Sequence, residues 1–265
     1  MKQIQIAILG YGTVGTGVAR LLLENQEVLT HRVGAELKLK YIADIDTTTD
    51  RGLQLPEGVL IDDARRAVED PQVQVVVETI GGEGIAKALM ADALKAGKHV
   101  VTANKALLAK HGNELITTAA TTGADLAFEA SVGGCMPIIK TLRESLVGNR
   151  VHAMTGILNG TCNYIFTKIN EEGIPFAEAL DQAQAGGYAE ADPTLDVDGY
   201  DTAHKLAILG SLAYGMEINF DDIYIEGIRK VTPKDITYAR QFGYCIKLLA
   251  ISKNHGDQIE ARVHP

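Results

Sequence analysis

The fold of this chain is decided by residues 4–15, IQIAILGYGTVG. The apolar run at residues 4–9 predicts a short buried strand, and the residues from Val14 onward repeat apolar side chains at helical spacing. Between them, the spacing Gly10-x-Gly12-x-x-Gly15 permits a tight turn, a close approach of backbone to a pyrophosphate, and the packing of helix on strand. Such a turn is common by itself, but a strand before it and a helix after it are the context that its chemistry requires. We therefore expect this stretch to bind a dinucleotide.

Three more apolar segments have the character of buried strands, at residues 37–43, 73–77 and 98–103. Helical patterns lie between them, and strands interleaved with helices predict a parallel sheet with right-handed crossovers. The fold class predicted for residues 1–128 is therefore an α/β, Rossmann-type nucleotide-binding domain. Ligands of such sheets bind at the carboxyl ends of the strands, where Gly10, Asp44, Gly81 and Asn104 fall.

After residue 128 this alternation stops. The sequence predicts a helix from Pro137, a strand at residues 151–158, helices near residues 161–171 and 175–185, and a long helix that ends at Ala213. This mixture indicates a second, α+β domain for substrate binding and dimerisation at residues 129–265. An alternating strand pattern at residues 259–265 is still under way at the last residue, so we expect the domain to be incomplete at its carboxyl end.

Composition narrows the class of protein. Lys and Arg total 25 against 34 Asp and Glu, a net charge of -9, which disfavours a nucleic-acid partner or an anionic membrane surface. No apolar run approaches the length of a transmembrane helix. The cysteines Cys135, Cys162 and Cys245 are scattered and lack C-x-x-C spacing, which predicts a cytoplasmic protein without disulfides or zinc.

The cofactor's ribose is expected near the end of the second predicted strand. Asp44 lies there, and it and Asp46 would favour the ribose diol of NAD, whereas Arg51 could bind the 2′-phosphate of NADP. These residues leave NAD and NADP both open.

The fourth predicted strand ends in Asn104 and Lys105. One interpretation is an asparagine N-cap followed by a solvated lysine, which is a common arrangement. The other is a lysine at the ligand edge that orients or protonates a carbonyl oxygen during hydride transfer. The residues alone do not decide between them.

Residues 186–205, GGYAEADPTLDVDGYDTAHK, are a carboxylate-rich loop that leads into an apolar helix. Asp201 and Lys205 are one turn apart on the same helix face. An arbitrary pair at this spacing is a surface ion pair, but the apolar residues that follow favour partial burial, and a partly buried lysine beside a carboxylate is a suitable proton donor. Glu190 and the nearby aspartates could bind a substrate ammonium group. The spacing of the aspartates does not match a calcium loop.

Five segments, in this order, resemble the homoserine dehydrogenase family: GYGTVG at residues 10–15, TANK at 102–105, EASVGG at 129–134, GILNGTCNY at 156–164, and the loop at 186–205. They are spread over nearly the whole chain, and the later ones are far more specific than the glycine turn. The resemblance implies a homodimer that interconverts L-aspartate 4-semialdehyde and L-homoserine with NAD or NADP, in threonine, methionine and isoleucine biosynthesis.

The resemblance also implies roles for residues at matching positions. Lys105 would lie beside the nicotinamide and the substrate, Glu190 and Asp201 would hold the amino-acid end of the substrate, and Lys205 would donate the proton to the aldehyde oxygen. The dinucleotide would be lined by Tyr11, Thr13 and Val14 together with Gly10, Gly12, Gly15 and Asp44. A sodium-like cation would be held by the Glu129 region and the backbone carbonyls of Val132, Gly134 and Met136.

The sequence departs from the family in two respects. Cys135 stands where the family has a third glycine, and we interpret it as a small buried thiol that fills a gap, with an oxidisable thiol at the ion site as the alternative. The family also continues beyond this point, often with a regulatory ACT domain, so feedback inhibition by threonine is not inferred. Two other functions stay open: another NAD(P)-linked amino-acid dehydrogenase, and a truncated, non-catalytic dinucleotide-binding or dimerisation module.

Overall fold

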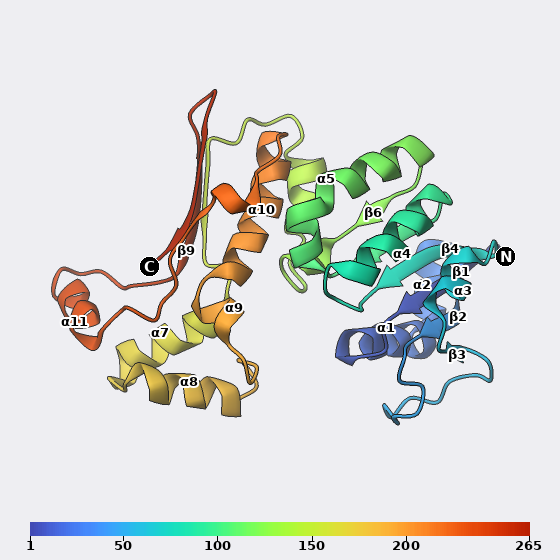
Figure 1. The fold of residues 1–265 in the computed structure, drawn as a ribbon, viewed down its shortest axis with the longest axis horizontal. Helices are drawn as coiled ribbons and strands as arrows, with labels where there is room; N and C mark the ends of the chain where they lie inside the picture. The colour runs from blue at the N-terminus through green and yellow to red at the C-terminus, as the bar shows by residue number, and fades with distance from the viewer. The chain divides into compact units, whose positions relative to one another are not determined.

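The chain divides into two compact units, Met1–Met136 and Pro137–Pro265 (Figure 1). This division comes from a computed structural model that describes residues 1–265. The boundary predicted after residue 128 lies before this division, because the turn at Glu129–Ser131 packs against strand β5 (His99–Thr102) of the first unit.

The first unit is built on a six-stranded sheet with the order β3-β2-β1-β4-β5-β6, in which all neighbouring strands are parallel. Its strands are β1 (Gln3–Leu9), β2 (Glu36–Ala43), β3 (Leu60–Ile61), β4 (Val73–Glu78), β5 (His99–Thr102) and β6 (Leu126–Ala127). Its helices are α1 (Thr13–Glu24), α2 (Gln26–Val33), α3 (Ala64–Glu69), α4 (Gly84–Lys95) and α5 (Lys105–Thr122). This strand order is that of dinucleotide-binding folds, and the predicted Rossmann-type architecture is confirmed.

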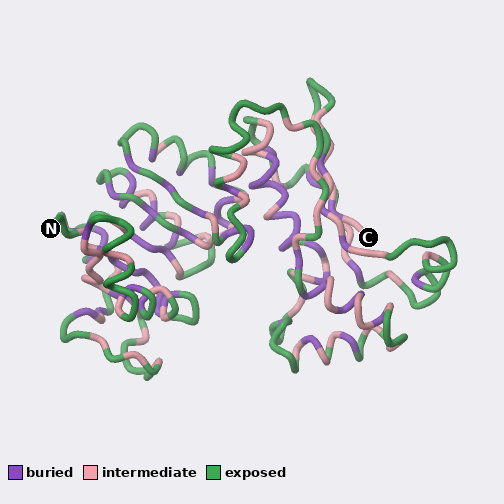
Figure 2. The backbone as a smooth tube through the Cα atoms, turned by 180° about the vertical axis from the view of Figure 1, so that it is seen from behind, coloured by how far each residue is buried: buried purple, intermediate pink, exposed green.

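The hydrophobic core of this unit lies along the central strands of the sheet. Ile8 and Leu9 of β1 and Ile42 of β2 have no exposed surface, and buried residues line the strands and the helices beside them (Figure 2). Parallel strands covered on both faces have continuous apolar runs, which is why these segments were recognisable in the sequence. The strand order reverses between β1 and β4, and ligands of such sheets bind at this reversal, outside the carboxyl ends of the strands.

Helix α2 was not predicted by the sequence pattern. None of its residues is buried, so it has no apolar stripe at helical spacing. It ends at Gly34, whose left-handed backbone (φ 72°) closes the last turn in the way that glycine does at many helix ends.

The second unit combines a four-stranded mixed sheet with six helices. The sheet has the order β7-β9-β10-β8, with antiparallel pairs except for the parallel pair β10–β8; its strands are β7 (Ala153–Gly156), β8 (Tyr224–Ile225), β9 (Leu249–Asn254) and β10 (Ile259–His264). The helices are α6 (Ile138–Lys140), α7 (Gly160–Glu172), α8 (Phe176–Ala185), α9 (Thr194–Val197), α10 (Tyr200–Tyr214) and α11 (Pro233–Gln241). Helix α10 packs on β9 and β10, and α7 packs on α8 and α9. The predicted α+β character is therefore confirmed.

Two elements of this unit are shorter than predicted. The helix expected from Pro137 is only the short α6, which continues into a π-helical turn at Thr141–Ser145. The strand expected at residues 151–158 is reduced to β7, because the following residues leave the sheet to begin the site described below.

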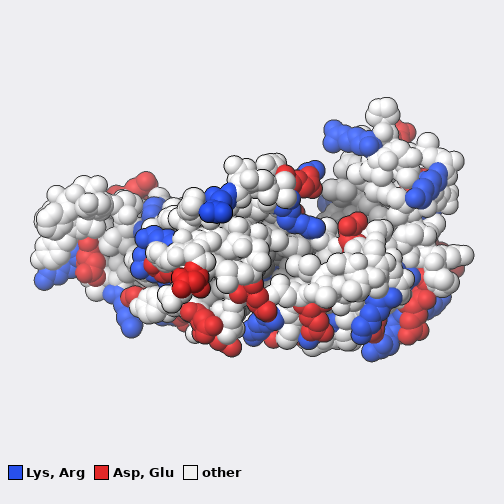
Figure 3. Space-filling view, turned by 90° about the horizontal axis from the view of Figure 1, so that it is seen from above, with Lys and Arg blue, Asp and Glu red and all other residues white.

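Acidic and basic side chains are interspersed over the face seen in Figure 3, so the net charge of -9 does not gather there into one large patch. None of the helices combines the length and the apolar character that are required to cross a membrane.

Candidate active site

The glycine-rich turn of the first unit requires glycine for steric reasons. Gly10 has a φ of 97°, and a Cβ there would lie 2.7 Å from the carbonyl carbon of Thr79. A Cβ on Gly15 would lie 2.0 Å from the carbonyl oxygen of Gly10. Around Gly12, by contrast, nothing lies within 4 Å of the position of a Cβ, so this part of the turn is open to a ligand.

The amino end of α1 is suited to a phosphate group. No side chain caps this end, and the first turn contains no acidic residue. Thr13 and Val14 are exposed there. Backbone N–H groups at a helix amino terminus, together with the helix dipole, bind anions. The turn therefore fits the pyrophosphate of a dinucleotide.

Asp44 and Tyr11 are bound to each other beside this turn. The carboxylate of Asp44 accepts hydrogen bonds from the backbone N–H of Tyr11 at 2.5 Å and of Asp46 at 2.9 Å. The phenol ring of Tyr11 is buried in the core, with 2% of the residue exposed, and burial raises its pKa. The backbone of Tyr11 thus shapes the turn, while its ring packs inward.

Arg51 covers the ring of Tyr11, with its guanidinium carbon 4.7 Å from the ring centroid. It donates to the Asp46 carboxylate at 3.1 Å and to the Thr49 carbonyl at 2.8 Å. Hydrogen bonds from Thr49 and Thr48 hold the pKa of Asp46 well below its usual range. Asp44, Asp46 and Arg51 therefore adjoin the glycine turn together, as the alternatives for ribose and 2′-phosphate binding require.

A buried carboxylate connects the loops after β4 and β5. Glu78, which has no exposed surface, accepts hydrogen bonds from the backbone of Gly81 at 2.9 Å and from the hydroxyl of Thr102 at 2.5 Å. Thr102 Oγ1 accepts in turn from the N–H of Asn104, whose side chain donates to the Gly82 carbonyl at 2.7 Å. This network fixes the loop that carries Lys105 at the carboxyl edge of the sheet.

Asn104 is an N-cap, as predicted, because its side-chain oxygen accepts from the N–H of Leu107 at 3.2 Å. Lys105 follows it at the first position of α5 and is half-buried. Asn104 thus caps the helix while Lys105 lies at the ligand edge of the sheet, so the N-cap does not exclude a role of Lys105 at that edge.

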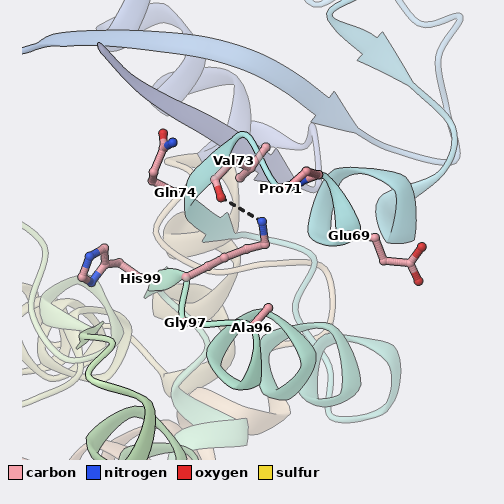
Figure 4. A pocket seen from close by; sticks show the side chains of 8 residues that line it. Glu69, Pro71, Val73, Gln74, Ala96, Gly97 and His99 are labelled. Carbon is pink, nitrogen blue, oxygen red and sulfur yellow. Dashed lines mark hydrogen bonds between the residues drawn. The ribbon is translucent and has the colours of Figure 1, made fainter. Parts of the chain in front are cut away.

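A pocket of about 390 Å³ lies at the opposite edge of this sheet, at the amino ends of β4 and β5 (Figure 4). The ammonium of Lys98 is buried at its floor and donates to the carbonyls of Asp70 at 2.6 Å and Val73 at 2.8 Å. Burial lowers the pKa of Lys98. Because ligands of parallel sheets bind at the carboxyl edge, this pocket is separate from the predicted nucleotide site.

The second unit contains the predicted Asp201–Lys205 pair in a buried setting. Lys205 Nζ lies 2.8 Å from Asp201 Oδ2, and the two side chains are 17% and 7% exposed. The ammonium also donates to the Leu158 carbonyl at 2.8 Å. An ammonium has three N–H donors, so these two contacts leave one donor for a further oxygen atom. The pair is therefore not a surface ion pair.

Residues 186–205 form an ordered segment around this pair. Thr161 Oγ1 lies 2.6 Å from the Tyr188 carbonyl and 2.9 Å from Asp196 Oδ2, and its single proton is shared between them. The ring of Tyr188 stacks on that of Tyr164 at 4.6 Å between centroids. Glu190 is exposed, and its backbone carbonyl accepts from Gln184 at 3.0 Å.

Asn159 joins the two carboxylates of this segment that come from different helices. Its amide nitrogen donates to Asp196 of α9 at 2.7 Å and to Asp201 of α10 at 2.9 Å. The sequence assigned no role to Asn159, and it indicated Asp196 only as one of the aspartates near Glu190. The signal available was the match of residues 156–164 to the family, which marked the segment without assigning a role to its asparagine.

The residues predicted to hold a cation lie at the end of the first unit. Glu129 begins a 3-10 turn, Val132 is buried, and Gly134 and Met136 are exposed. The N–H of Met136 donates to the Gly133 carbonyl at 3.2 Å, which closes a tight turn around Cys135. The prediction of a buried thiol is wrong, because Cys135 lies exposed in this turn. It is the one non-glycine residue with a left-handed backbone, at φ 62°, which explains why glycine suits this position. Carboxylate and carbonyl oxygens are a donor set that fits a hard cation.

Two family models match the chain and together span both units. The model described as "Homoserine dehydrogenase, NAD binding domain" matches residues 10–129, and the model described as "Homoserine dehydrogenase" matches residues 137–265.

Individual relatives are similar to the chain over its whole length. A homoserine dehydrogenase of Neisseria gonorrhoeae is 45% identical over 265 residues, which are 100% of this chain and 61% of the relative. The crystal structure of a homoserine dehydrogenase from Thiobacillus denitrificans aligns with a TM-score of 0.93 at 45% identity, over 100% of this chain and 61% of that one. This chain thus spans about 61% of the length of these relatives.

Two archaeal structures align over more of their own length. A putative homoserine dehydrogenase from Archaeoglobus fulgidus has a TM-score of 0.85 at 35% identity, over 99% of this chain and 84% of that one. A hyperthermophilic archaeal homoserine dehydrogenase has a TM-score of 0.79 at 26% identity, over 99% of this chain and 81% of that one. Because the family models match residues in both units and the solved relatives align over nearly the whole chain, the chain belongs to the homoserine dehydrogenase family.

Proposed function

We propose that this chain carries the dinucleotide-binding and substrate-binding parts of an enzyme that interconverts L-aspartate 4-semialdehyde and L-homoserine. The observation that carries the proposal is the buried Asp201–Lys205 pair, in which the ammonium keeps one donor for a substrate oxygen. Family membership supports the same reaction.

The roles of the residues follow from the chemistry of carbonyl reduction. The nicotinamide, when bound, supplies the hydride in one direction and accepts it in the other. Lys205 donates a proton to the aldehyde oxygen, on which negative charge develops, and takes it back in the reverse direction. Asp201 holds the lysine side chain in place, and Glu190 and Asp201 bind the ammonium end of the amino acid. Lys105 contacts the carbonyl or the nicotinamide from the carboxyl edge of the first sheet.

The cofactor is proposed to be NADP or NAD, bound through residues 10–15 and Asp44. The description of the matching family model as an NAD binding domain supports a nicotinamide cofactor. The hyperthermophilic archaeal relative is in complex with NADPH, which supports NADP as a candidate. Arg51, beside the turn, is the residue that would distinguish the two cofactors, because only NADP has a 2′-phosphate to meet it.

A sodium-like cation is proposed at Glu129 and the carbonyls of Val132, Gly134 and Met136. The support is the oxygen donor set and the tight turn at residues 133–136. The cation would order this turn. The expected readout is a rise in melting temperature with sodium but not with a bulky monovalent cation at equal ionic strength.

A homodimer in the cytoplasm is also part of the proposal. Leu249 and Ile251 of β9 are half-buried and alternate with the buried Ala250 and Ser252, so they point away from the face that α10 covers. This second face would pair with that of another copy across a two-fold axis. Light scattering of the wild type and of an Ile251→Asp variant tests the dimer. The three free cysteines are compatible with a reducing compartment.

The decisive experiment is the oxidation of NADPH and NADH by this chain in the presence of L-aspartate 4-semialdehyde. Turnover with the semialdehyde, but not with other carbonyl acids, supports the proposal. Turnover only with a different carbonyl acid would identify another amino-acid dehydrogenase. Cofactor binding by calorimetry without turnover on any of them would identify a non-catalytic module.

A further inference from the structure

One carboxamide in the second unit donates to two carboxylates at once. Asn159 Nδ2 lies 2.7 Å from Asp196 Oδ1 and 2.9 Å from Asp201 Oδ2, and the residue is 5% exposed. A primary amide nitrogen carries two hydrogens, so both of them are used. The two carboxylates approach the same nitrogen from α9 and α10, which are far from it in the sequence.

The orientation of this amide is fixed by the helix that it caps. Asn159 Oδ1 accepts a hydrogen bond from the N–H of Cys162 at 2.8 Å, as the N-cap of α7. The oxygen must therefore face the helix and the nitrogen must face the carboxylates. Rotating the amide by half a turn would place its oxygen against two carboxylate oxygens.

Charged and titratable groups lie on the helices that contribute the partners of this amide. Asp201 is paired with Lys205, and Asp198 is paired with Arg229 at 2.5 Å. Burial raises the pKa of the Cys162 thiol, and the charges of Asp196, Asp201 and Asp198 add to this effect, so their field reaches the amino end of α7. His204 of α10 stacks on Phe220 with 4.5 Å between ring centroids. The groups concerned are Cys162 of α7, Asp196 of α9 with Asp198 at its carboxyl end, Asp201, His204 and Lys205 of α10, and Arg229.

Two carboxylates that both lie within hydrogen-bonding distance of one nitrogen are close enough to repel each other. When two carboxylates share a site without donors, one of them tends to take up a proton. The amide of Asn159 supplies a donor to each carboxylate and so favours their charged forms. We infer that Asn159 is a positioning residue, which holds Asp196 and Asp201 together as anions and thereby keeps Lys205 of the proposed site aimed at the substrate oxygen. We name the contacts of Asn159 with Asp196 and Asp201 the carboxylate clamp. The inference rests on the proposed function for the role of Lys205, whereas the clamp itself does not depend on that function.

The first test is an Asn159→Asp variant. Aspartate has nearly the same shape and caps a helix as well as asparagine does, but it replaces the donor with a third carboxylate. A proton must then enter the cluster, so we expect kcat/KM to stay near the wild-type value in acid and to fall about tenfold or more as the pH rises past neutrality. A new titration in the pH profile is the signature that a merely structural role would not produce.

The matched control is Asn219→Asp. Asn219 is also a cap, of the short turn at Phe220–Asp222, and its side chain donates to the Asp222 carboxylate at 3.1 Å, but it is exposed. The same substitution beside an exposed carboxylate should leave the pH profile unchanged. An unaltered profile in Asn159→Asp, or an equal change in both variants, would overturn the inference.

A second variant, Asn159→Ser, keeps a capping hydroxyl but removes the amide without adding charge. Asp196 and Asp201 then lose a donor, their protonation becomes easier, and the acid limb of the kcat/KM profile should move to higher pH. If the limb stays in place while the variant remains folded, the clamp does not hold these carboxylates as anions.

Melting temperatures measured against pH, without cofactor or substrate, separate this inference from the proposed function. The difference between wild type and Asn159→Asp should widen as the pH rises, whereas that for Asn219→Asp should stay constant. If the wild type does not turn over the semialdehyde, the proposed function fails and the melting curves still decide the clamp. If the wild type is active but both the profile and the melting difference are independent of pH, the clamp fails and the proposed function stands.

Discussion

Replacing Lys205 by methionine separates the chemistry of the buried pair from its contribution to stability. Methionine has a similar length and no charge, so the main loss is the ammonium that contacts Asp201 and the Leu158 carbonyl. Loss of a positioned proton donor costs about 10²–10⁴ in rate, which corresponds to roughly 3–5 kcal/mol of barrier. We therefore expect kcat to fall by at least about a hundredfold, with the affinity for NAD(P)H unchanged.

The same change should also destabilise the fold. Removing one partner of a buried ion pair costs about 3–5 kcal/mol, because the remaining charge is left without its counterion. Because the Lys205 side chain is still 17% exposed, we expect a loss of about 3 kcal/mol in the free energy of unfolding, at the lower end of that range. Adding Asp201→Asn removes the stranded charge, so the double variant should regain stability without regaining activity.

The assays are the rate of NAD(P)H oxidation with aspartate semialdehyde and the free energy of unfolding in urea. Lys168→Met is the matched control: Lys168 forms a pair of the same i,i+4 spacing with Glu172, but the side chains are 28% and 44% exposed. Because the pair is largely exposed and screened by solvent, this change should leave the free energy of unfolding and kcat nearly unchanged. A Lys205→Met enzyme with turnover close to wild type would refute the proton-donor role.

Three further predictions concern the first unit. Arg51→Leu should raise KM for NADPH about 10–100-fold and leave KM for NADH unchanged if the guanidinium binds the 2′-phosphate, since a hydrogen-bonded charge is worth about 1.5–3 kcal/mol; equal changes for both cofactors would contradict this role. Cys135→Gly should stabilise the protein by about 1 kcal/mol by relieving the left-handed backbone, as measured by urea unfolding, whereas Cys135→Ala, which keeps the Cβ, should not. Contacts with Lys40, with the N–H of Gln72 and with Tyr41 lower the pKa of Asp70 to about 2, so this carboxylate stabilises the fold above its unfolded pKa of about 4 and the contribution is lost as the pH falls toward 2. Asp70→Asn should therefore reduce the acid sensitivity of the melting temperature between about pH 4 and pH 2, and an unchanged slope would show that the contact is screened.

The parallel sheet was predictable because its strands are buried on both faces. Residues 4–9 and 73–77 are apolar except for Gln5 and Gln74, and each segment ends near a loop that the sheet places at its ligand edge. The short strand β3 was missed because two residues cannot show a period. Helix α2 was missed because it lies on the surface and has no buried face.

The candidate site was predictable only in part, for a different reason. The i,i+4 spacing of Asp201 and Lys205 is local and visible in the sequence. The contacts of Asn159 with Asp196 and Asp201 span 37 and 42 residues, and no local pattern encodes them. The link from Glu78 to Thr102 is likewise invisible, since it depends on β4 and β5 being neighbours in the sheet.

The buried ammonium of Lys98 makes this side chain an internal reporter for chemical labelling. Its nitrogen donates to two carbonyls beneath the pocket at the amino edge of the sheet, and only 6% of the residue is exposed. An acylating reagent should therefore modify Lys98 only in molecules whose sheet has opened, whereas Lys140, with 66% of its side chain exposed, reacts in the native state. The ratio of acylation at these two positions, read by mass spectrometry, would measure the opening of the nucleotide-binding unit without any cofactor, substrate or spectroscopic probe.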